Sequence, residues 1–191
     1  MPAPKTYKPK VHIVIDIETL STDKRTAIIE IGAVLAMGTE SDKLSLAVKP
    51  SSFSGKPYDI DVETISWHEK IHTGYLERME AEGDDIETAM QKFCDWIRPY
   101  AENFEVHMWS QGKDFDFPIL EYALRTCGHK LPWAYSRVHC LRDLVWLNPV
   151  TRLKNRPDEL PQHEALSDAM YEAMQLRATV GNSDWLRRLF K

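Results

Sequence analysis

The order of apolar segments predicts an α/β fold with a partly antiparallel sheet and helices on both faces. Three segments with strand character follow one another across short gaps, as in an antiparallel meander: residues 11–17, 27–37 and 44–48. Segments with helical spacing then alternate with further strand-like segments, which is typical of parallel strands joined by helices. A chain of 191 residues with 43% hydrophobic content suits one domain of ordinary size.

We expect this domain over residues 11–191, behind a flexible, basic and proline-rich tail over residues 1–10. The first strand is strongly apolar, and the second contains Gly32. Proline and glycine then mark a loop over residues 51–58. Two short helices are predicted at residues 62–69 and 74–82.

A longer helix is predicted after Asp84 or Asp85, since the apolar residues that follow keep helical spacing. Residues 105–109 form the next predicted strand, and a helix over 118–127 has Pro118 in its first turn and Gly128 just past its end. The remaining segments follow in order: mixed strand and helix signals at 138–147, a proline-containing loop at 148–162, a helix at 164–180 and an amphipathic turn at 185–190.

Charge and cysteine content limit the classes of function. The net charge of −5 argues against a broad basic surface that binds nucleic acid without specificity. The cysteines Cys94, Cys127 and Cys140 have neither zinc-site spacing nor the even number of a disulfide framework, so we expect reduced thiols. Without a signal-peptide pattern or an apolar run of membrane-helix length, we expect a cytoplasmic protein without a membrane partner.

Two acids interrupt the first predicted strand. Residues two apart on a strand point to the same face, so Asp16 and Glu18 project together near the end of that strand. Like charges at this spacing repel each other, and a divalent cation removes the conflict. The alternative is a solvent-facing pair on an edge strand, with Ile15 and Ile17 turned inward.

A third acid, Asp116, stands in the stretch WSQGKDFDFPIL, at or just before a predicted helix start. A helix N-terminus stabilises a negative group at this place. The alternative is an ordinary helix cap, and Asp114 is the near competitor for either role.

His163 and Asp168 stand in the stretch QHEALSDAM. On one continuous helix they would point about 140° apart, whereas a histidine on the preceding loop can lie over the same site as Asp168. Asp168 adjoins the apolar stripe of the helix, so it would lie against the sheet. The alternative is an exposed histidine and a solvated acid.

Along the chain, these residues form the motifs D-x-E, F-D and H-x4-D, in that order. This order of motifs resembles that of the DEDDh group of 3′–5′ exonucleases, which have a ribonuclease H-like fold. The resemblance covers about residues 11–180. Within this group, the sequence is most similar to the small phage-type and prophage-type members, which form the exodeoxyribonuclease VIII-like and exoribonuclease-like branch. The segments that carry this likeness are VIDIETLST, AIIEIGAV, DVETISWHEK, WSQGKDFDFPIL and LRDL.

The resemblance implies a hydrolase that removes nucleotides from single-stranded 3′ ends. The acids Asp16, Glu18, Asp116 and Asp168 would hold two magnesium or manganese ions, and His163 would be the general base. Thr19 and Leu20 would contact the terminal nucleotide, with Leu20 as a candidate wedge between bases. Gln111 stands where relatives often have an asparagine that contacts substrate.

Several alternatives stay open at this level. The resemblance favours single-stranded DNA as substrate, with RNA second, and it allows a homodimer and a host-cell cytoplasmic location if a phage encodes the chain. The aromatic residues Trp67, Trp109 and Phe115 are candidates for stacking on bases, although large rings more often belong to the core. Competing functions are a catalytically idle binding domain of this fold and a magnesium-dependent endonuclease or resolvase.

Overall fold

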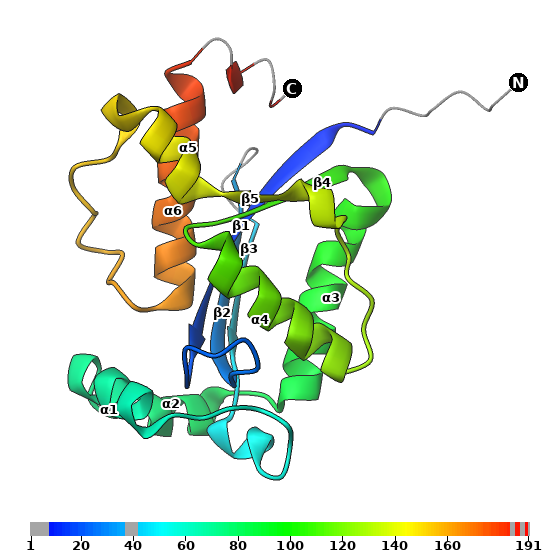
Figure 1. Cartoon of the computed structure of the whole chain (residues 1–191), viewed down its shortest axis with the longest axis vertical. Coiled ribbons are helices and arrows are strands. Elements are labelled where there is room, and N and C mark those ends of the chain that lie inside the picture. Colours follow the sequence, from blue (N-terminus) through cyan, green and yellow to red (C-terminus); the bar gives the residue numbers. More distant parts are fainter. Residues whose placement is uncertain (1–7, 37–41, 184–185, 188–189, 191) are drawn as a thin grey trace, which may run out of the picture.

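The computed structural model describes residues 8–36, 42–183, 186–187 and 190. A five-stranded sheet with the order β3-β2-β1-β4-β5 forms its centre (Figure 1). The strands are β1 (Lys10–Thr19), β2 (Ile28–Leu35), β3 (Lys43–Ala47), β4 (Glu105–Ser110) and β5 (Val138–Cys140). The pairs β1–β2 and β2–β3 are antiparallel, whereas β1–β4 and β4–β5 are parallel. The prediction of a mixed sheet with an antiparallel start is confirmed.

Helices cover both faces of the sheet, as predicted (Figure 1). They are α1 (Val62–Ile71), α2 (Tyr75–Glu82), α3 (Ile86–Asn103), α4 (Lys113–Thr126), α5 (Leu141–Leu147) and α6 (Ala165–Gly181). One core cluster joins Ile13 and Ile15 of β1 to α3 and α4, and a second joins Val14 to α5 and α6. The central strand β1 is therefore buried on both faces, which explains its continuous apolar run.

The start of α6 is fixed on β2 by a close backbone contact. A β-carbon built on Gly32 would lie 2.2 Å from the carbonyl carbon of Ala165, so this position requires glycine. Next to it, buried Glu30 accepts hydrogen bonds from the Ala165 N–H and from the Tyr75 hydroxyl, at 3.1 and 2.8 Å. These contacts set where the residues just before and within α6 meet the sheet.

One helix boundary differs from the prediction. The helix expected from Pro118 begins at Lys113, five residues earlier, so Pro118 lies inside α4. The carbonyl of Gly112 accepts the N–H groups of Phe115 and Asp116 and thereby closes the first turn. Pro118 lies in the second turn, where its missing N–H removes one helical hydrogen bond. Gly128 has a φ of 81° just past the helix, as predicted.

Most other boundaries lie within two residues of the predictions; the strand predicted at 27–37 is shorter, at Ile28–Leu35, and residue 37 of that prediction lies outside the described residues. The segment 148–162 contains one short 3-10 turn, Pro149–Thr151, and runs from α5 along α6 to the start of that helix (Figure 1). Of the predicted tail, residues 1–7 lie outside the described residues, while the Lys8 ammonium donates to the Glu102 carbonyl at 2.6 Å. The predicted turn at 185–190 falls largely outside the described residues. In the described part of the chain, no helix has the length and apolarity needed to cross a bilayer.

Candidate active site

One cavity of about 330 Å³ at the carboxyl end of β1 brings the predicted catalytic residues together. Asp16, Glu18, Asp116, His163 and Asp168 all line it, although they come from three separate regions of the chain. Gln111, Arg142 and Glu172 also line this cavity, which we call the acid cavity. The topology explains why these residues converge, because β1 and β4 are parallel neighbours whose carboxyl ends lie at the same end of the sheet.

The alternation of β1 points the acid pair into the cavity. Asp16 and Glu18 are half-buried, while Ile15 and Ile17 between and beside them are buried in the core. The strand pairing shifts register between Glu18 and Thr19, so the regular ladder ends directly after the acid pair. The edge-strand alternative therefore does not hold, since β1 is the central strand.

Asp116 lies in the first turn of α4, and its side chain is buried at 5% relative exposure. Burial raises the pKa of Asp116 to about 6. A surface helix cap would be exposed, as Asp114 in the same turn is. Burial thus distinguishes the two acids, since Asp116 lies in the acid cavity and Asp114 is exposed.

His163 lies on the loop before α6, as the loop interpretation requires. Its backbone has a φ of 63°, in the left-handed region that residues other than glycine seldom adopt. Its N–H donates to Asp168 Oδ2 at 2.7 Å, and its ring meets the Trp67 ring edge-on with centroids 4.8 Å apart. Backbone strain of this kind, held by surrounding contacts, is typical of functional sites.

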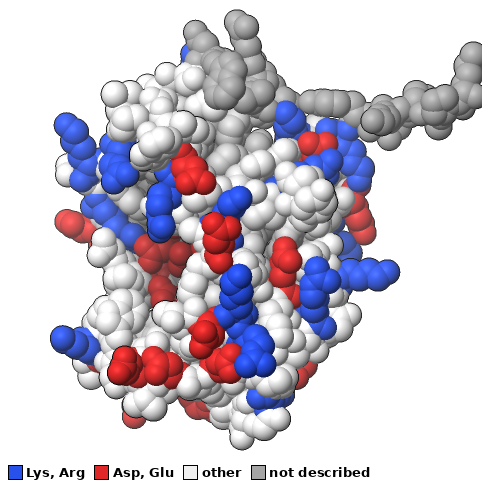
Figure 2. All heavy atoms as spheres, in the orientation of Figure 1, with Lys and Arg blue, Asp and Glu red and all other residues white. Residues whose placement is uncertain are grey.

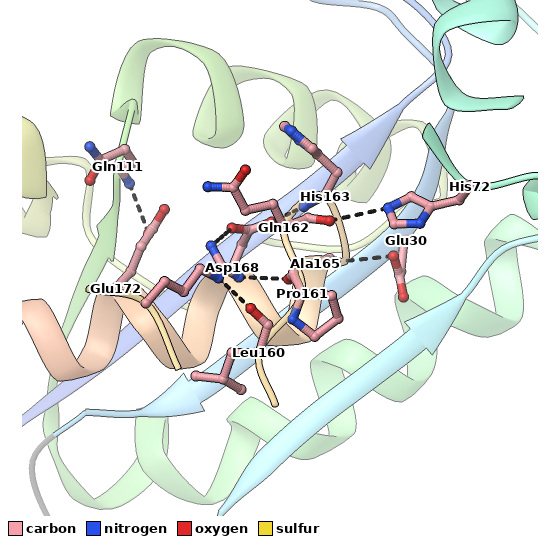
Figure 3. Close-up of polar contacts among 11 residues, drawn as sticks. Glu30, His72, Gln111, Leu160, Pro161, Gln162, His163, Ala165, Asp168 and Glu172 are labelled. Carbon is pink, nitrogen blue, oxygen red and sulfur yellow. Dashed lines mark hydrogen bonds and ion pairs between the residues drawn. The ribbon is translucent and has the colours of Figure 1, made fainter. Parts of the chain in front are cut away.

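Arg156 fastens this loop to α6 through three partners that Figure 3 labels, Asp168, Leu160 and Pro161. Its Nη1 lies 2.5 Å from Asp168 Oδ1, while Nε and Nη2 donate to the carbonyls of Leu160 and Pro161. Both oxygens of Asp168 thus accept hydrogen bonds, one from Arg156 and one from the His163 backbone. The arginine therefore fixes the turn that carries His163.

Sequence reasoning missed a fifth acid, Glu172, which is 7% exposed and lines the acid cavity. Its Oε2 accepts the Gln111 N–H at 3.0 Å (Figure 3). The sequence does contain a signal for this residue, since Glu172 follows Asp168 by four residues and falls on the alanine-rich apolar stripe of α6. A glutamate in such a stripe indicates a buried acid.

The acid cavity concentrates negative charge in a buried place. Burial, followed by repulsion from neighbouring acids, raises the pKa of Glu18 to about 8 and the pKa values of Asp16 and Glu172 well above their usual range. Oxygen or nitrogen atoms of Glu18, His163 and Asp168 lie within 4.8 Å of one another. Carboxylate-rich, mutually repelling sites of this kind fit a divalent cation that prefers oxygen ligands.

A second cavity, of about 490 Å³, adjoins Glu18 on the side of α1. We call it the α1 cavity. Its lining includes Thr19, Trp67 and Phe115, and the residues Trp67 and Phe115 are 41% and 37% exposed. Trp109, by contrast, is a core residue. Leu20 is 1% exposed within the core and lines none of the cavities described here, whereas Gln111 stands at the rim of the acid cavity.

Comparison with solved structures identifies the fold. The nuclease domain of 3′hExo, a DEDDh family member bound to rAMP, matches with a TM-score of 0.61 and 15% identity over 95% of this chain and 96% of that one. Cell-death related nuclease 4 (CRN-4) matches with a TM-score of 0.63 and 14% identity, over 91% of this chain and 64% of that one. Pop2p of S. pombe, in its Mg²⁺- and Mn²⁺-bound form, matches with a TM-score of 0.59 and 15% identity, over 93% and 84%. The fold is that of the DEDDh, ribonuclease H-like nucleases.

A family model gives the more particular assignment. The model of the Rv2179c-like 3′–5′ exoribonuclease domain matches residues 11–180. The chain belongs to this family, and its enzyme class is 3′–5′ exonuclease acting on phosphodiester bonds. No curated protein matches the sequence significantly. The likeness to the phage-type, exodeoxyribonuclease VIII-like branch is not confirmed.

Proposed function

We propose that the protein is a metal-dependent exonuclease that removes mononucleotides from the 3′ end of single-stranded RNA, with single-stranded DNA as the second candidate substrate. The observation that carries the proposal is the acid cavity, in which Asp16, Glu18, Asp116 and Asp168 surround His163. The family description favours RNA over the DNA substrate expected from the sequence. The rAMP bound to the nuclease domain of 3′hExo points in the same direction.

The four acids are the proposed ligands of two magnesium or manganese ions. Their burial and mutual repulsion support this assignment, and the related fold of Pop2p carries Mg²⁺ and Mn²⁺. When bound, such ions lower the pKa of water and stabilise the negative charge of a phosphate under attack. Glu172 is buried beside Asp168 and adds to the negative charge that a cation would neutralise.

His163 is the proposed general base. His163 is half-buried at the cavity, where a ring nitrogen can take a proton from an attacking water. The edge-on contact with Trp67 and the backbone bond to Asp168 hold the ring in place before substrate arrives. Such preorganisation lowers the entropy cost of proton transfer.

The α1 cavity is the proposed site of the 3′-terminal nucleoside. Its volume suits a nucleoside, and the partly exposed rings of Trp67 and Phe115 offer surfaces for stacking on a base of any sequence. Thr19 lines this cavity, but its hydroxyl already donates to the Ser21 carbonyl at 2.8 Å. We therefore expect Thr19 to contact the nucleoside through its backbone and by packing rather than through its hydroxyl. Leu20 is buried, and we do not include it among the substrate contacts.

Single strands of RNA and DNA labelled at the 3′ or the 5′ end test the proposal, with Mg²⁺, Mn²⁺ or EDTA in the buffer. We expect metal-dependent release of mononucleotides from the 3′ end, faster with RNA. Asp116→Asn should abolish release, while Asp114→Asn, an exposed acid in the same helical turn, should not. A lack of cleavage with every strand and metal would favour an idle binding domain, and faster cleavage of DNA would reverse the substrate assignment.

A further inference from the structure

A basic hollow adjoins the acid cavity on the side away from α1. It has a volume of about 270 Å³, and Arg142, Arg152 and Arg156 line it together with Gln111, Asp168 and Glu172. Arg142, Gln111, Asp168 and Glu172 line both the hollow and the acid cavity, so the two are continuous. Figure 2 shows acidic atoms deep in this face of the molecule, with basic side chains over the α5 region beside them.

Two of the three arginines have unused donors. Arg156 is tied to Asp168 and to the carbonyls of Leu160 and Pro161. The side chains of Arg142 and Arg152 are exposed, and neither has an ion pair or hydrogen bond among the described residues. In a chain with a net charge of −5, two unpaired guanidinium groups facing one hollow are a concentrated positive site.

Arg142 reaches the edge of the acid cavity itself. A β-carbon built on Gly112 would lie 3.7 Å from Arg142 Nη2 and 4.0 Å from Asp116 Oδ2. The guanidinium group and the proposed metal ligand are therefore close neighbours across Gly112. A group held by Arg142 would lie directly beside the phosphate that is cleaved at the acids.

The positions of the three cavities set the direction in which a bound nucleic-acid strand would run. If the α1 cavity takes the 3′-terminal nucleoside and the acids act on the scissile phosphate, the rest of the strand leaves on the opposite side. The basic hollow occupies that side. Guanidinium groups present paired N–H donors that match two phosphate oxygens, and they bind phosphodiesters more specifically than lysine does.

We propose that Arg142 and Arg152 bind the backbone phosphate that lies immediately 5′ of the scissile phosphate. This inference rests on the proposed function, because the scissile phosphate at the acid cavity sets the register. The arginines bind the strand and fix how far it enters the site. Arg156 keeps the structural task of holding the loop.

Two dinucleotides that differ by one phosphate test the inference in turnover. A dinucleotide with a free 5′ hydroxyl contains the scissile phosphate alone, whereas its 5′-phosphorylated form also carries the phosphate assigned to the arginines. We expect wild-type kcat/KM to be higher for the phosphorylated form, on the order of tenfold. In the double variant Arg142→Gln/Arg152→Gln this ratio should fall towards one, whereas Lys154→Gln, an exposed charge on the same loop, should preserve it. An unchanged ratio in the double variant would overturn the inference.

Binding provides a readout that does not depend on cleavage. Fluorescence anisotropy of a labelled single-stranded hexanucleotide with the Asp16→Asn protein gives the affinity as a function of salt. The slope of log affinity against log salt should decrease by about 0.7 for each arginine removed, and Lys154→Gln should leave it unchanged. If wild-type protein cleaves no strand but the double variant loses this salt-dependent binding, the proposed function and the assigned register fail, and the arginines remain a binding site for backbone phosphate. Equal slopes with and without the arginines would contradict the site whatever the activity.

Discussion

The guanidinium group of Arg156 lies 2.5 Å from the carboxylate of Asp168, and it also holds the carbonyls of Leu160 and Pro161. One side chain thus joins the loop that carries the proposed base to the helix that carries a proposed metal ligand. Both side chains of the pair are largely buried, so water screens the interaction weakly.

Loss of this clamp should affect both stability and catalysis. We expect Arg156→Gln to lower the free energy of unfolding by about 1–3 kcal/mol, because it leaves Asp168 partly buried without its cation. We also expect kcat to fall more than KM rises, since His163 loses its fixed position. Denaturant unfolding and steady-state kinetics measure the two effects, with Lys154→Gln as the control on the same loop. A fully active and equally stable Arg156→Gln protein would show that the clamp has no role.

The left-handed backbone at His163 predicts an unusual order of stabilities among its variants. His163→Gly and His163→Ala should both lose cleavage, because each removes the imidazole. The glycine variant should nevertheless be the more stable of the two by about 1 kcal/mol, since glycine adopts a φ of 63° without strain. Thermal unfolding of both proteins checks the order. A more stable alanine variant would mean that the loop relaxes out of this conformation.

Metal binding should be measurable as stabilisation. The buried acids repel one another, and a cation that binds the folded state alone stabilises it by about 2.7 kcal/mol at a concentration 100 times its Kd. We expect Mg²⁺ and Mn²⁺ to raise the melting temperature above its value in EDTA. Glu172→Gln should raise the melting temperature in EDTA and reduce the gain on adding metal, because one repelling charge is gone. Asp114→Asn, outside the cavity, should change neither value, and a metal-independent melting temperature would argue against the site.

The metal-free protein should become less stable as the pH rises from 6.5 to 8. Burial raises the pKa of Glu18 from 4.5 to about 8, so in this window the folded state binds a proton that the unfolded state has already released. Stability therefore falls with rising pH. Burial lowers the pKa values of His12, which is buried, and of His139, which is half-buried, so both histidines affect stability below this window. Melting temperatures in EDTA check the slope, which Glu18→Gln should reduce; a wild-type melting temperature that rises from pH 6.5 to 8 would contradict the prediction.

The contact between β2 and α6 predicts a sharp difference between two glycines. Gly32→Ala forces a methyl group to within 2.2 Å of the Ala165 backbone, so α6 must move away from the sheet. We expect a loss of about 2 kcal/mol or more in stability, together with reduced activity, since α6 carries Asp168. Gly181→Ala, at the other end of α6 with open space around it, should be neutral or slightly stabilising. Denaturant unfolding compares the two, and equal effects would show that α6 is not held at Gly32.

The sequence by itself determined the order and type of the elements and the acids Asp16, Glu18, Asp116 and Asp168 as candidates. Periodicity is a local property, so strand and helix patterns are readable without tertiary contacts. The one clear boundary error, at α4, arose because the Gly112 carbonyl starts the helix before the proline that usually marks such a start.

Only the tertiary structure decided which side chains share the acid cavity and in which direction their pKa values shift there. The stripe of α6 indicates that Glu172 is buried, but only the tertiary structure shows that its carboxylate accepts the Gln111 N–H and lines the acid cavity. Leu20 left the proposed substrate contacts because the core covers it. The clamp by Arg156 and the position of Arg152 depend on how the segment 148–162 folds along α6, and Arg142 joins them from α5. Burial and long-range contact set these properties, and both arise from packing between elements far apart in the chain.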